Sequence, residues 1–176
     1  GGGLQDVPVG GWDRIEAEFQ GGLKRVKQYV DEFGNSRVSA KHKGEDGFAL
    51  GTWVSSRRNE HSTKKLAPDR IGELEMVPGW VWNPIEADFQ EGLKRLKQYV
   101  DEFGNSRVSA KHKDEDGFAL GTWVSSRRNE HSTKKLDPDR IRQLELVPGW
   151  VWNPIEADFQ EGLKRLMKYV DIGRAP

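Results

Sequence analysis

The sequence contains no cysteine, which excludes disulfide bonds and catalytic or metal-binding thiolates. It also lacks long apolar runs: nothing approaches the roughly 18 consecutive apolar residues of a membrane helix, and no signal peptide is visible. We therefore expect a cytoplasmic protein without a membrane partner. The phosphate-binding loop G-x-x-x-x-G-K-[ST] is absent too, so this chain should not hydrolyse nucleotides.

An excess of either charge is also missing, since 28 Lys and Arg balance 28 Asp and Glu. Overall charge therefore neither favours nor excludes an anionic partner, and only the distribution of charge can inform function. Hydrophobic residues are scarce at 35%, but seven Trp and seven Phe supply large areas to bury. A small core is thus feasible.

The most prominent feature is an internal repeat. Trp12 recurs as Trp82 and Trp152, and residues 12–81 and 82–151 differ at only 10 of 70 positions. Such repetition is typical of an array in which neighbouring units do the same job. An active site is normally needed once, whereas a surface that binds a long, repetitive partner gains from being copied. We therefore do not expect an enzyme.

The repeat sets the expected domain boundaries. Residues 1–11 are interpreted as the tail of a preceding repeat or as added residues, because Leu4, Val7 and Pro8 align with Leu74, Val77 and Pro78. Residues 12–81 and 82–151 form two complete repeats. Residues 152–176 form the first helix of a truncated third repeat, so the chain is interpreted as a piece of a larger protein.

Each repeat is expected to contain three helices. In the second repeat, apolar residues spaced three and four apart predict a first helix that starts at the cap Asn83 and stops at Gly104. A polar loop over 104–118 precedes a second helix that begins near Ala119. A short third helix opens at Asp137-Pro138. The fold class is therefore all-α, with two tandem three-helix units and one extra C-terminal helix.

Three further features predict packing. Gly92 lies mid-helix, where glycine costs about 1 kcal/mol, which suggests a close helix approach. The connection at 77–82 carries two Trp and two Val, so we expect it to be buried and to hold consecutive units in a defined relation. The apolar face of the helix at 153–170 should dock on the second unit or on another chain.

The motifs of the repeat point to a known family. They are the F-x-x-x-L-x-x-L-x-x-Y helix from Phe89 to Tyr99, then D-G-F-A-L-G-T-W-V-S-S-R-R, K-L-D-P-D-R-I-x-x-L-E and P-G-W-x-W. Together they resemble the helicase-associated repeat of bacteria. The sequence departs from that pattern at Phe103-Gly104, often His-Gly, at Val108-Ser109, often Val-Pro, and at Arg127, often Gln, which makes it more basic.

The resemblance implies tandem three-helix repeats that accompany a helicase motor and bind nucleic acid. From it we expect an auxiliary nucleic-acid-binding module, with DNA favoured over RNA, with a helicase motor domain in the parent protein and with no cofactor. The alternative is a protein–protein docking or spacer array without nucleic-acid contact. Salt discriminates the two, because phosphate binding weakens steeply with salt.

The charge distribution identifies candidate contact residues. Residues 104–143 carry nine Lys and Arg against six Asp and Glu, whereas residues 82–103 carry three against five. The loop and second helix of each repeat are therefore the candidate phosphate-binding surface, although an ordinary solvated face has the same composition. The candidates are Arg37, Lys41, Lys43, Arg57, Arg58, Lys64, Lys65, Arg107, Lys111, Lys113, Arg127, Arg128, Lys134 and Lys135.

Other residues are interpreted as structural. The tryptophans are expected in the core rather than as base-stacking platforms, and Arg128 can equally be a structural ion-pair partner. The four histidines match no zinc spacing, and Ser125-Ser126 show no sign of activation, so neither a metal site nor a catalytic site is expected. Asp114-Glu115-Asp116 is interpreted as a turn and cap.

Overall fold

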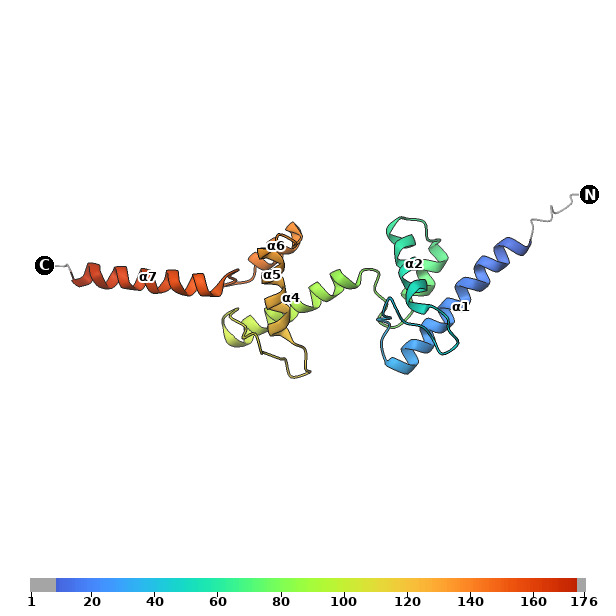
Figure 1. Cartoon of the computed structure of the whole chain (residues 1–176), viewed down its shortest axis with the longest axis horizontal. Coiled ribbons are helices and arrows are strands. Elements are labelled where there is room, and N and C mark those ends of the chain that lie inside the picture. The colour runs from blue at the N-terminus through green and yellow to red at the C-terminus, as the bar shows by residue number, and fades with distance from the viewer. Residues whose placement is uncertain (1–8, 174–176) are drawn as a thin grey trace, which may run out of the picture. The chain divides into compact units, whose positions relative to one another are not determined.

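The computed structural model describes residues 9–173, and the side chains of residues 13–173. Within that range the chain forms seven α-helices and no β-strand, which confirms the all-α prediction (Figure 1). The chain divides into two compact units, Gly1–Ala87 and Asp88–Pro176. Residues 1–8 of the tail expected at the N-terminus lie outside the described residues.

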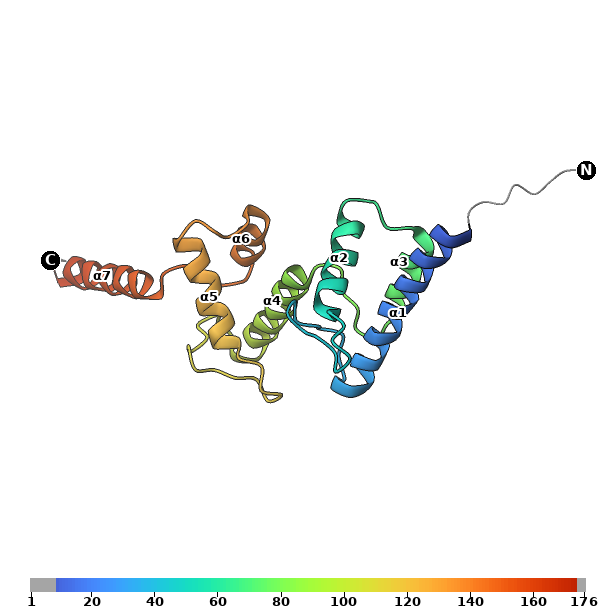
Figure 2. The ribbon, with the colours of Figure 1, turned by 45° about the vertical axis from the view of Figure 1, so that its right-hand side comes forward.

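The first unit contains helices α1 (Val9–Phe33), α2 (Leu50–Ser62) and α3 (Pro68–Glu75). Figures 1 and 2 show α2 crossing α1, with α3 beside α1. Two polar contacts join α1 to α3: Arg70 pairs with Glu16 at 3.2 Å, and Gln20 donates to Glu73 at 3.1 Å.

The second unit repeats this arrangement with α4 (Pro84–Phe103), α5 (Leu120–Ser132) and α6 (Pro138–Glu145), and adds α7 (Pro154–Gly173). Its core is formed by the same positions as the core of the first unit. The two sets are Phe19, Leu23, Val26, Val38, Leu50, Trp53, Val54, Leu66, Leu74 and Val77, and Phe89, Leu93, Leu96, Val108, Leu120, Trp123, Val124, Leu136, Leu144 and Val147.

The helix boundaries follow local capping chemistry. Asn83 Oδ1 accepts a hydrogen bond from the Glu86 N–H at 3.1 Å, and Pro84 takes the first helical position of α4. Gly104 follows the end of that helix with a φ of +75°, a left-handed conformation that glycine adopts easily. Ala119 precedes α5, and Asp137 caps α6. These boundaries confirm the sequence predictions.

Helix α1 begins earlier than its counterpart. It starts at Val9, whereas the repeat register predicts a start beside Asp13, the equivalent of Asn83. The difference lies at the next position: Pro84 has no N–H and restricts the residue before it, whereas Arg14 imposes no such limit. The helix can therefore continue toward the N-terminus.

The mid-helix glycines permit close packing, as expected. A Cβ built on Gly92 would lie 1.9 Å from Cε2 of Trp123, and one on Gly22 would lie 2.0 Å from Cε2 of Trp53. The indole of the second helix therefore lies directly on the backbone of the first. Gly162 in α7 meets nothing within 4 Å, so the same residue has no packing role there.

The connection after the third helix is less buried than predicted: Val77 is buried, Trp80, Val81 and Trp82 are half-buried, and Pro78 and Gly79 are exposed. Val77 is 2% exposed, and Trp80 and Trp82 pack against the core of the first unit. Trp82 also stacks on His61, with ring centroids 3.9 Å apart. Val147, Trp150, Trp152 and His131 repeat this arrangement in the second unit.

The face of α7 is exposed. Phe159 is 62% exposed, whereas its equivalents Phe19 and Phe89 are each 2% exposed. The expected docking of this helix on the second unit is therefore not found. Helices α1 and α4 bury their apolar faces against the second and third helices of their own repeats, whereas α7 has no buried residue among those described.

Candidate nucleic-acid interface

The first arginine of the Arg-Arg pair in each second helix is engaged within its own unit. Arg57 Nη2 donates to Glu60 at 2.6 Å, and Arg127 Nη2 donates to Glu130 at 2.5 Å. Their guanidinium carbons lie 5.2 Å and 5.4 Å from the ring centroids of Trp53 and Trp123. These arginines brace the second helix and cover the buried indole.

The second arginine of each pair fastens the inter-repeat connection. Arg58 Nε donates to the carbonyl of Val81 at 2.9 Å, and Arg128 Nε donates to that of Val151 at 3.0 Å. Each guanidinium lies 4.9 Å from the ring centroid of the nearby Trp80 or Trp150. These contacts support a structural role for Arg128. Its partners are a backbone carbonyl and an indole ring, whereas the sequence analysis expected an acidic side chain.

These half-buried arginines have perturbed electrostatics. Burial, and secondarily the charge of Arg37, lowers the pKa of Arg58. Burial and the charge of Arg107 act in the same direction on the pKa of Arg128. Nη2 of each is buried without a hydrogen-bond partner among the described residues. Since those atoms are closed to solvent, Arg58 and Arg128 are poorly placed to receive a phosphate.

The loop arginines are engaged as well. Arg107 pairs with Asp158, near the start of α7, at 2.9 Å. Its counterpart Arg37 also has an electrostatic or hydrogen-bond interaction. Five of the six candidate arginines, Arg57, Arg58, Arg107, Arg127 and Arg128, therefore make hydrogen bonds or ion pairs within the chain.

The lysines among the candidates are different. All eight are exposed, and none has an ion-pair partner among the residues that the structure describes. In the first unit they form two pairs at opposite ends of α2. Lys41 and Lys43 lie in the loop that is held to the start of α2 by a hydrogen bond from Gly51 N to His42 O, whereas Lys64 and Lys65 follow its end. Their equivalents are Lys111, Lys113, Lys134 and Lys135.

One lysine of each terminal pair has an unusual backbone. Lys64 and Lys134 have φ values of 59° and 60°, in the left-handed region that normally favours glycine after a helix. Amide hydrogen bonds from Lys64 to His61 O and from Lys65 to Glu60 O close the end of α2. Positive charge there also interacts favourably with the helix dipole, so part of the preference for lysine is local.

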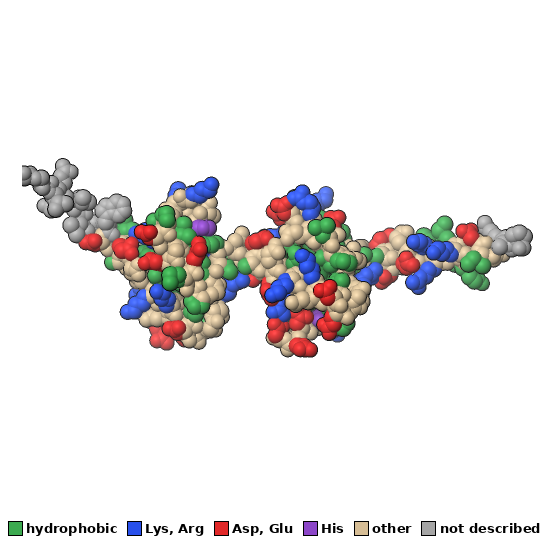
Figure 3. Space-filling view, turned by 180° about the vertical axis from the view of Figure 1, so that it is seen from behind, with side chains coloured by type: hydrophobic (Ala, Val, Ile, Leu, Met, Phe, Trp, Pro, Cys, Tyr) green, Lys and Arg blue, Asp and Glu red, His purple; other side chains and the backbone are tan. Residues whose placement is uncertain are grey.

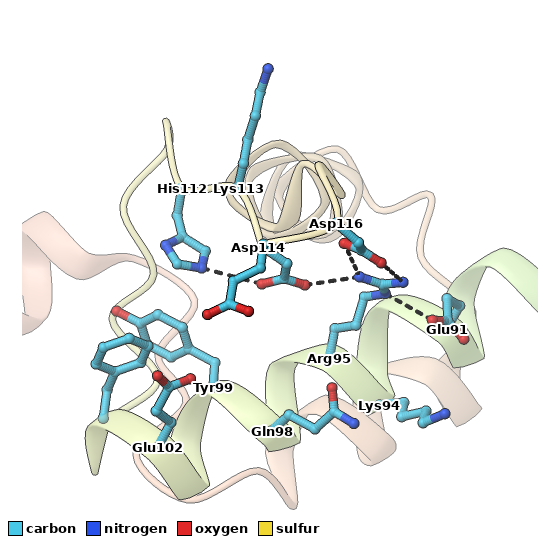
Figure 4. Close-up of a pocket in the computed structure, with 12 residues that line it drawn as sticks. Glu91, Lys94, Arg95, Gln98, Tyr99, Glu102, His112, Lys113, Asp114 and Asp116 are labelled. Carbon is cyan, nitrogen blue, oxygen red and sulfur yellow. Dashed lines mark hydrogen bonds and ion pairs between the residues drawn. The ribbon is translucent and has the colours of Figure 1, made fainter.

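Acidic side chains interrupt the positive charge of the loops. Arg95 of α4 bonds to Glu91 at 2.8 Å, to Asp114 at 3.1 Å and to Asp116 at 2.7 Å (Figure 4). Hydrogen bonds from Arg95 and from the N–H of Phe118 lower the pKa of Asp116 to about 2. Asp116 thus acts as a turn residue, as expected, and Asp114 and Asp116 are ion-pair partners of Arg95, but the residue that precedes α5 is Ala119, so no acid of this loop caps that helix.

This acidic network borders a surface pocket of about 500 Å³, whose walls include Tyr99, Glu102 and His112 (Figure 4). On the face that Figure 3 shows, Lys and Arg are interspersed with Asp and Glu rather than gathered in one continuous basic surface. On this face the basic side chains therefore form no single positive surface.

The histidines of each unit pack against aromatic side chains. Within residues 13–173, no group of three or more His, Asp or Glu side chains is placed to hold a metal ion. His61 and His131 stack on tryptophans, and His42 and His112 contact tyrosine and phenylalanine rings. No helix in the described part of the chain is long and apolar enough to cross a bilayer.

Comparison with known proteins identifies one family. The family model described as "Helicase associated domain" matches the chain twice in tandem, over residues 16–83 and 86–153. Searches of curated proteins and of solved structures found no match. The two matched segments coincide closely with the two repeats.

Proposed function

Because the chain belongs to the family of helicase-associated domains, we propose that it is an auxiliary module that binds nucleic acid through phosphate contacts. The supporting observation is the set of eight exposed lysines without ion-pair partners, arranged as one pair at each end of α2 and of α5. Flexible ammonium groups on an array suit a partner that carries a regularly spaced negative charge.

The dimensions agree with several contacts per unit. A helix of 13 residues, the length of α2 and α5, spans about 20 Å at roughly 1.5 Å per residue. One strand of a duplex presents a phosphate about every 3.4 Å along the axis, so the two lysine pairs bracket about six phosphates. Two units double the contacts without requiring a base sequence.

The proposal gives arginines and lysines different roles. Lysines contact phosphate, whereas Arg57, Arg58 and their equivalents keep the second helix and the inter-repeat connection in place. The left-handed backbone of Lys64 and Lys134 supports a role for these lysines, because glycine would adopt that conformation with less strain. DNA is the favoured nucleic acid, and the parent protein carries a helicase motor whose hold on its substrate the module strengthens.

Charge reversal tests this proposal. Changing Lys41, Lys43, Lys111 and Lys113 to Glu, or Lys64, Lys65, Lys134 and Lys135 to Glu, should abolish binding to labelled oligonucleotides at moderate salt. The matched control reverses Lys24, Lys27, Lys94 and Lys97, which are exposed on α1 and α4 and give the same change in net charge. Single- and double-stranded oligonucleotides are compared at two salt concentrations by fluorescence anisotropy.

The control separates a specific surface from general charge. Equal losses in all three variants would show that only net charge matters, and undiminished binding in the first two would remove the lysines from the interface. For four lost contacts, the slope of log affinity against log salt should flatten by about 3 to 4.

A protein-docking function remains the second candidate, because α7 exposes Ile155 at 84% and Phe159 at 62%. Exposed apolar faces of this kind mark interaction sites for proteins. Binding that survives high salt would favour this candidate over phosphate contact.

A further inference from the structure

The first unit has a pocket of about 600 Å³ between α1 and α2. Two aromatic residues, Phe48 and Trp53, and two arginines, Arg25 and Arg57, are among the residues that line it. Ala17, Glu18, Gly21, Ala49, Thr52 and Ser56 complete the lining. Nothing in the sequence analysis identifies this pocket, because its two arginines belong to different helices.

The second unit shows what this position can hold. Gly21 is replaced there by Glu91, and the Glu91 carboxylate accepts a hydrogen bond from Arg95 Nε at 2.8 Å. Arg95 thereby contacts three carboxylates, those of Glu91, Asp114 and Asp116. The guanidinium at this position therefore donates to an anionic oxygen carried by its own helix.

In the first unit Arg25, the equivalent of Arg95, has no carboxylate at the position of Glu91. Both carboxylates lost from the network correspond to glycines, Gly21 for Glu91 and Gly44 for Asp114. Arg25 retains a single carboxylate partner: its Nε and Nη2 both donate to Oδ2 of Asp46, at 3.0 Å and 2.9 Å. The remaining bond, from Nη1, goes to the carbonyl of Gly21 at 3.1 Å.

The second arginine of this pocket, Arg57, differs from its copy Arg127, but its spare Nε is closed to solvent and is not placed to meet a ligand. Arg127 gives both Nε and Nη2 to Glu130, but Arg57 gives only Nη2 to Glu60, and its Nε is buried without a partner among the described residues. The pocket also includes the first turn of α2, whose cap residue Ala49 makes no side-chain hydrogen bond. The positive end of that helix dipole thus faces the pocket, whose lining includes one acidic residue, Glu18.

We propose that this pocket of the first unit binds a phosphate group of the nucleic-acid strand, in the position that the Glu91 carboxylate takes in the second unit. The phosphate accepts a hydrogen bond from Arg25 and lies near the positive end of the α2 dipole. The second unit closes the same site with its own side chain, so the two units are unequal despite their near identity. This inference rests on the proposed function, which supplies the phosphate.

One acidic residue, Glu18, also lines the proposed phosphate site. Its carboxylate lines the pocket, so it opposes an incoming anion. Glu18→Gln should therefore strengthen phosphate binding, whereas the equivalent change in the second unit, Asp88→Asn, should not, because Glu91 still fills the site there.

The test exchanges the residues at the equivalent positions 21 and 91. Gly21→Glu supplies the missing carboxylate, Gly21→Gln fills the same space without charge, and Glu91→Gly opens the second unit. Position 21 tolerates the change, because an added Cβ meets only the flexible end of Arg25, Nη1, at 3.3 Å. The whole chain is labelled with ¹⁵N and titrated with inorganic phosphate while the Arg25 Nε–H and Trp53 indole signals are followed.

Phosphate should shift these signals in the original chain and in Gly21→Gln, but not in Gly21→Glu. Glu91→Gly should add matching shifts for Arg95 and Trp123. With oligonucleotides, one lost contact in Gly21→Glu should flatten the salt slope by about 0.9, and Glu91→Gly should steepen it by a similar amount. Equal behaviour of Gly21→Glu and the original chain would overturn the proposal.

The outcomes separate this site from the general function. If the lysine reversals abolish oligonucleotide binding but Gly21→Glu leaves it unchanged, the pocket is not a phosphate site, while the proposed function still stands. If inorganic phosphate shifts the signals but no oligonucleotide binds, the pocket is an anion site and the proposed binding of nucleic acid is wrong. If oligoglutamate, rather than an oligonucleotide, produced the Gly21-dependent shifts, the pocket would belong to an acidic protein partner and the phosphate assignment would fail.

Discussion

Arginine and lysine divide the work within each unit because their hydration differs. A guanidinium is planar and weakly hydrated, so it can lie on an indole and bond to a carbonyl while half-buried. Arg58 and Arg128 do this beside Trp80 and Trp150. An ammonium is strongly hydrated and stays in water, as Lys134 does. The residue type therefore indicates which cations hold the fold and which remain available.

This division predicts the effect of single truncations. Arg128→Ala removes the hydrogen bond to Val151 and uncovers Trp150, so it should lower the stability of the second unit by about 1.5–3 kcal/mol. Lys134→Ala should change stability little but weaken oligonucleotide binding. Urea denaturation and anisotropy measure the two effects. Reversed outcomes, with a stable Arg128 variant that no longer binds, would place phosphate at the arginine.

A second residue-scale prediction concerns acid. The pKa of Asp116 falls from 3.8 to about 2 on folding, chiefly through Arg95. A depressed carboxyl pKa stabilises the folded state above the ordinary value, and that stabilisation is lost as pH falls toward 2. Asp116→Asn should therefore lower the melting temperature at neutral pH, and the gap from the original chain should narrow between about pH 4 and 2. A gap independent of pH would exclude the ion pair as its cause.

At the scale of the element, the repeat supplies its own controls. The cap of α6 is Asp137, which accepts from the N–H of Asp139 at 2.8 Å, whereas Ala67 before α3 makes no side-chain hydrogen bond. Ala67→Asp should stabilise α3 by about 1 kcal/mol, and Asp137→Ala should destabilise α6 by a similar amount. Amide exchange should be faster in α3 than in α6 before the change. Equal exchange in the two helices would argue against a capping effect.

Helical glycines offer a second matched pair. Gly92→Ala places a Cβ 1.9 Å from Trp123, so the indole must move, and overpacking should cost about 1–3 kcal/mol. Gly162→Ala meets nothing within 4 Å and should instead raise the helicity of α7, since glycine costs about 1 kcal/mol against alanine. Denaturation of the first variant and circular dichroism of the second give the measurements. If Gly92→Ala left the stability unchanged, the space between Gly92 and Trp123 would be able to accommodate a methyl group.

The elements were largely predictable because their signals are local. Asn83, Gly104 and Asp137 act on backbone groups within a few residues, so their spacing in the sequence is sufficient evidence. The contacts of the candidate site are different. Arg128 bonds to a carbonyl 23 residues later, and Arg95 reaches Asp116 across the loop, which no local pattern predicts. The available signal was the comparison of copies, since Gly21 against Glu91 marks the pocket.

At the scale of the whole molecule, balanced charge makes distribution decisive. The chain has 28 acidic and 28 basic residues, so long-range attraction to a polyanion is weak and contact must come from local groups. Two of the 10 differences between the repeats, at Gly21 and Gly44, remove acids from one network in the first unit. Small changes of this kind can make repeated units unequal while the shared core is kept.

The last prediction concerns α7. The sequence suggests that removing this helix lowers the melting temperature, because a buried large apolar side chain is worth roughly 1.5–3 kcal/mol. In the structure α7 has no buried residue, so truncation after Asp158, which keeps the ion pair with Arg107, should leave the melting temperature of the chain unchanged. The same truncation should reduce binding of an apolar dye, since it removes Phe159 and Leu166, exposed by 62% and 57%. Calorimetry and dye fluorescence at two protein concentrations make the measurement. A lower melting temperature at both concentrations would show that α7 packs on its own chain, and a fall only at the higher one would show that it packs on another.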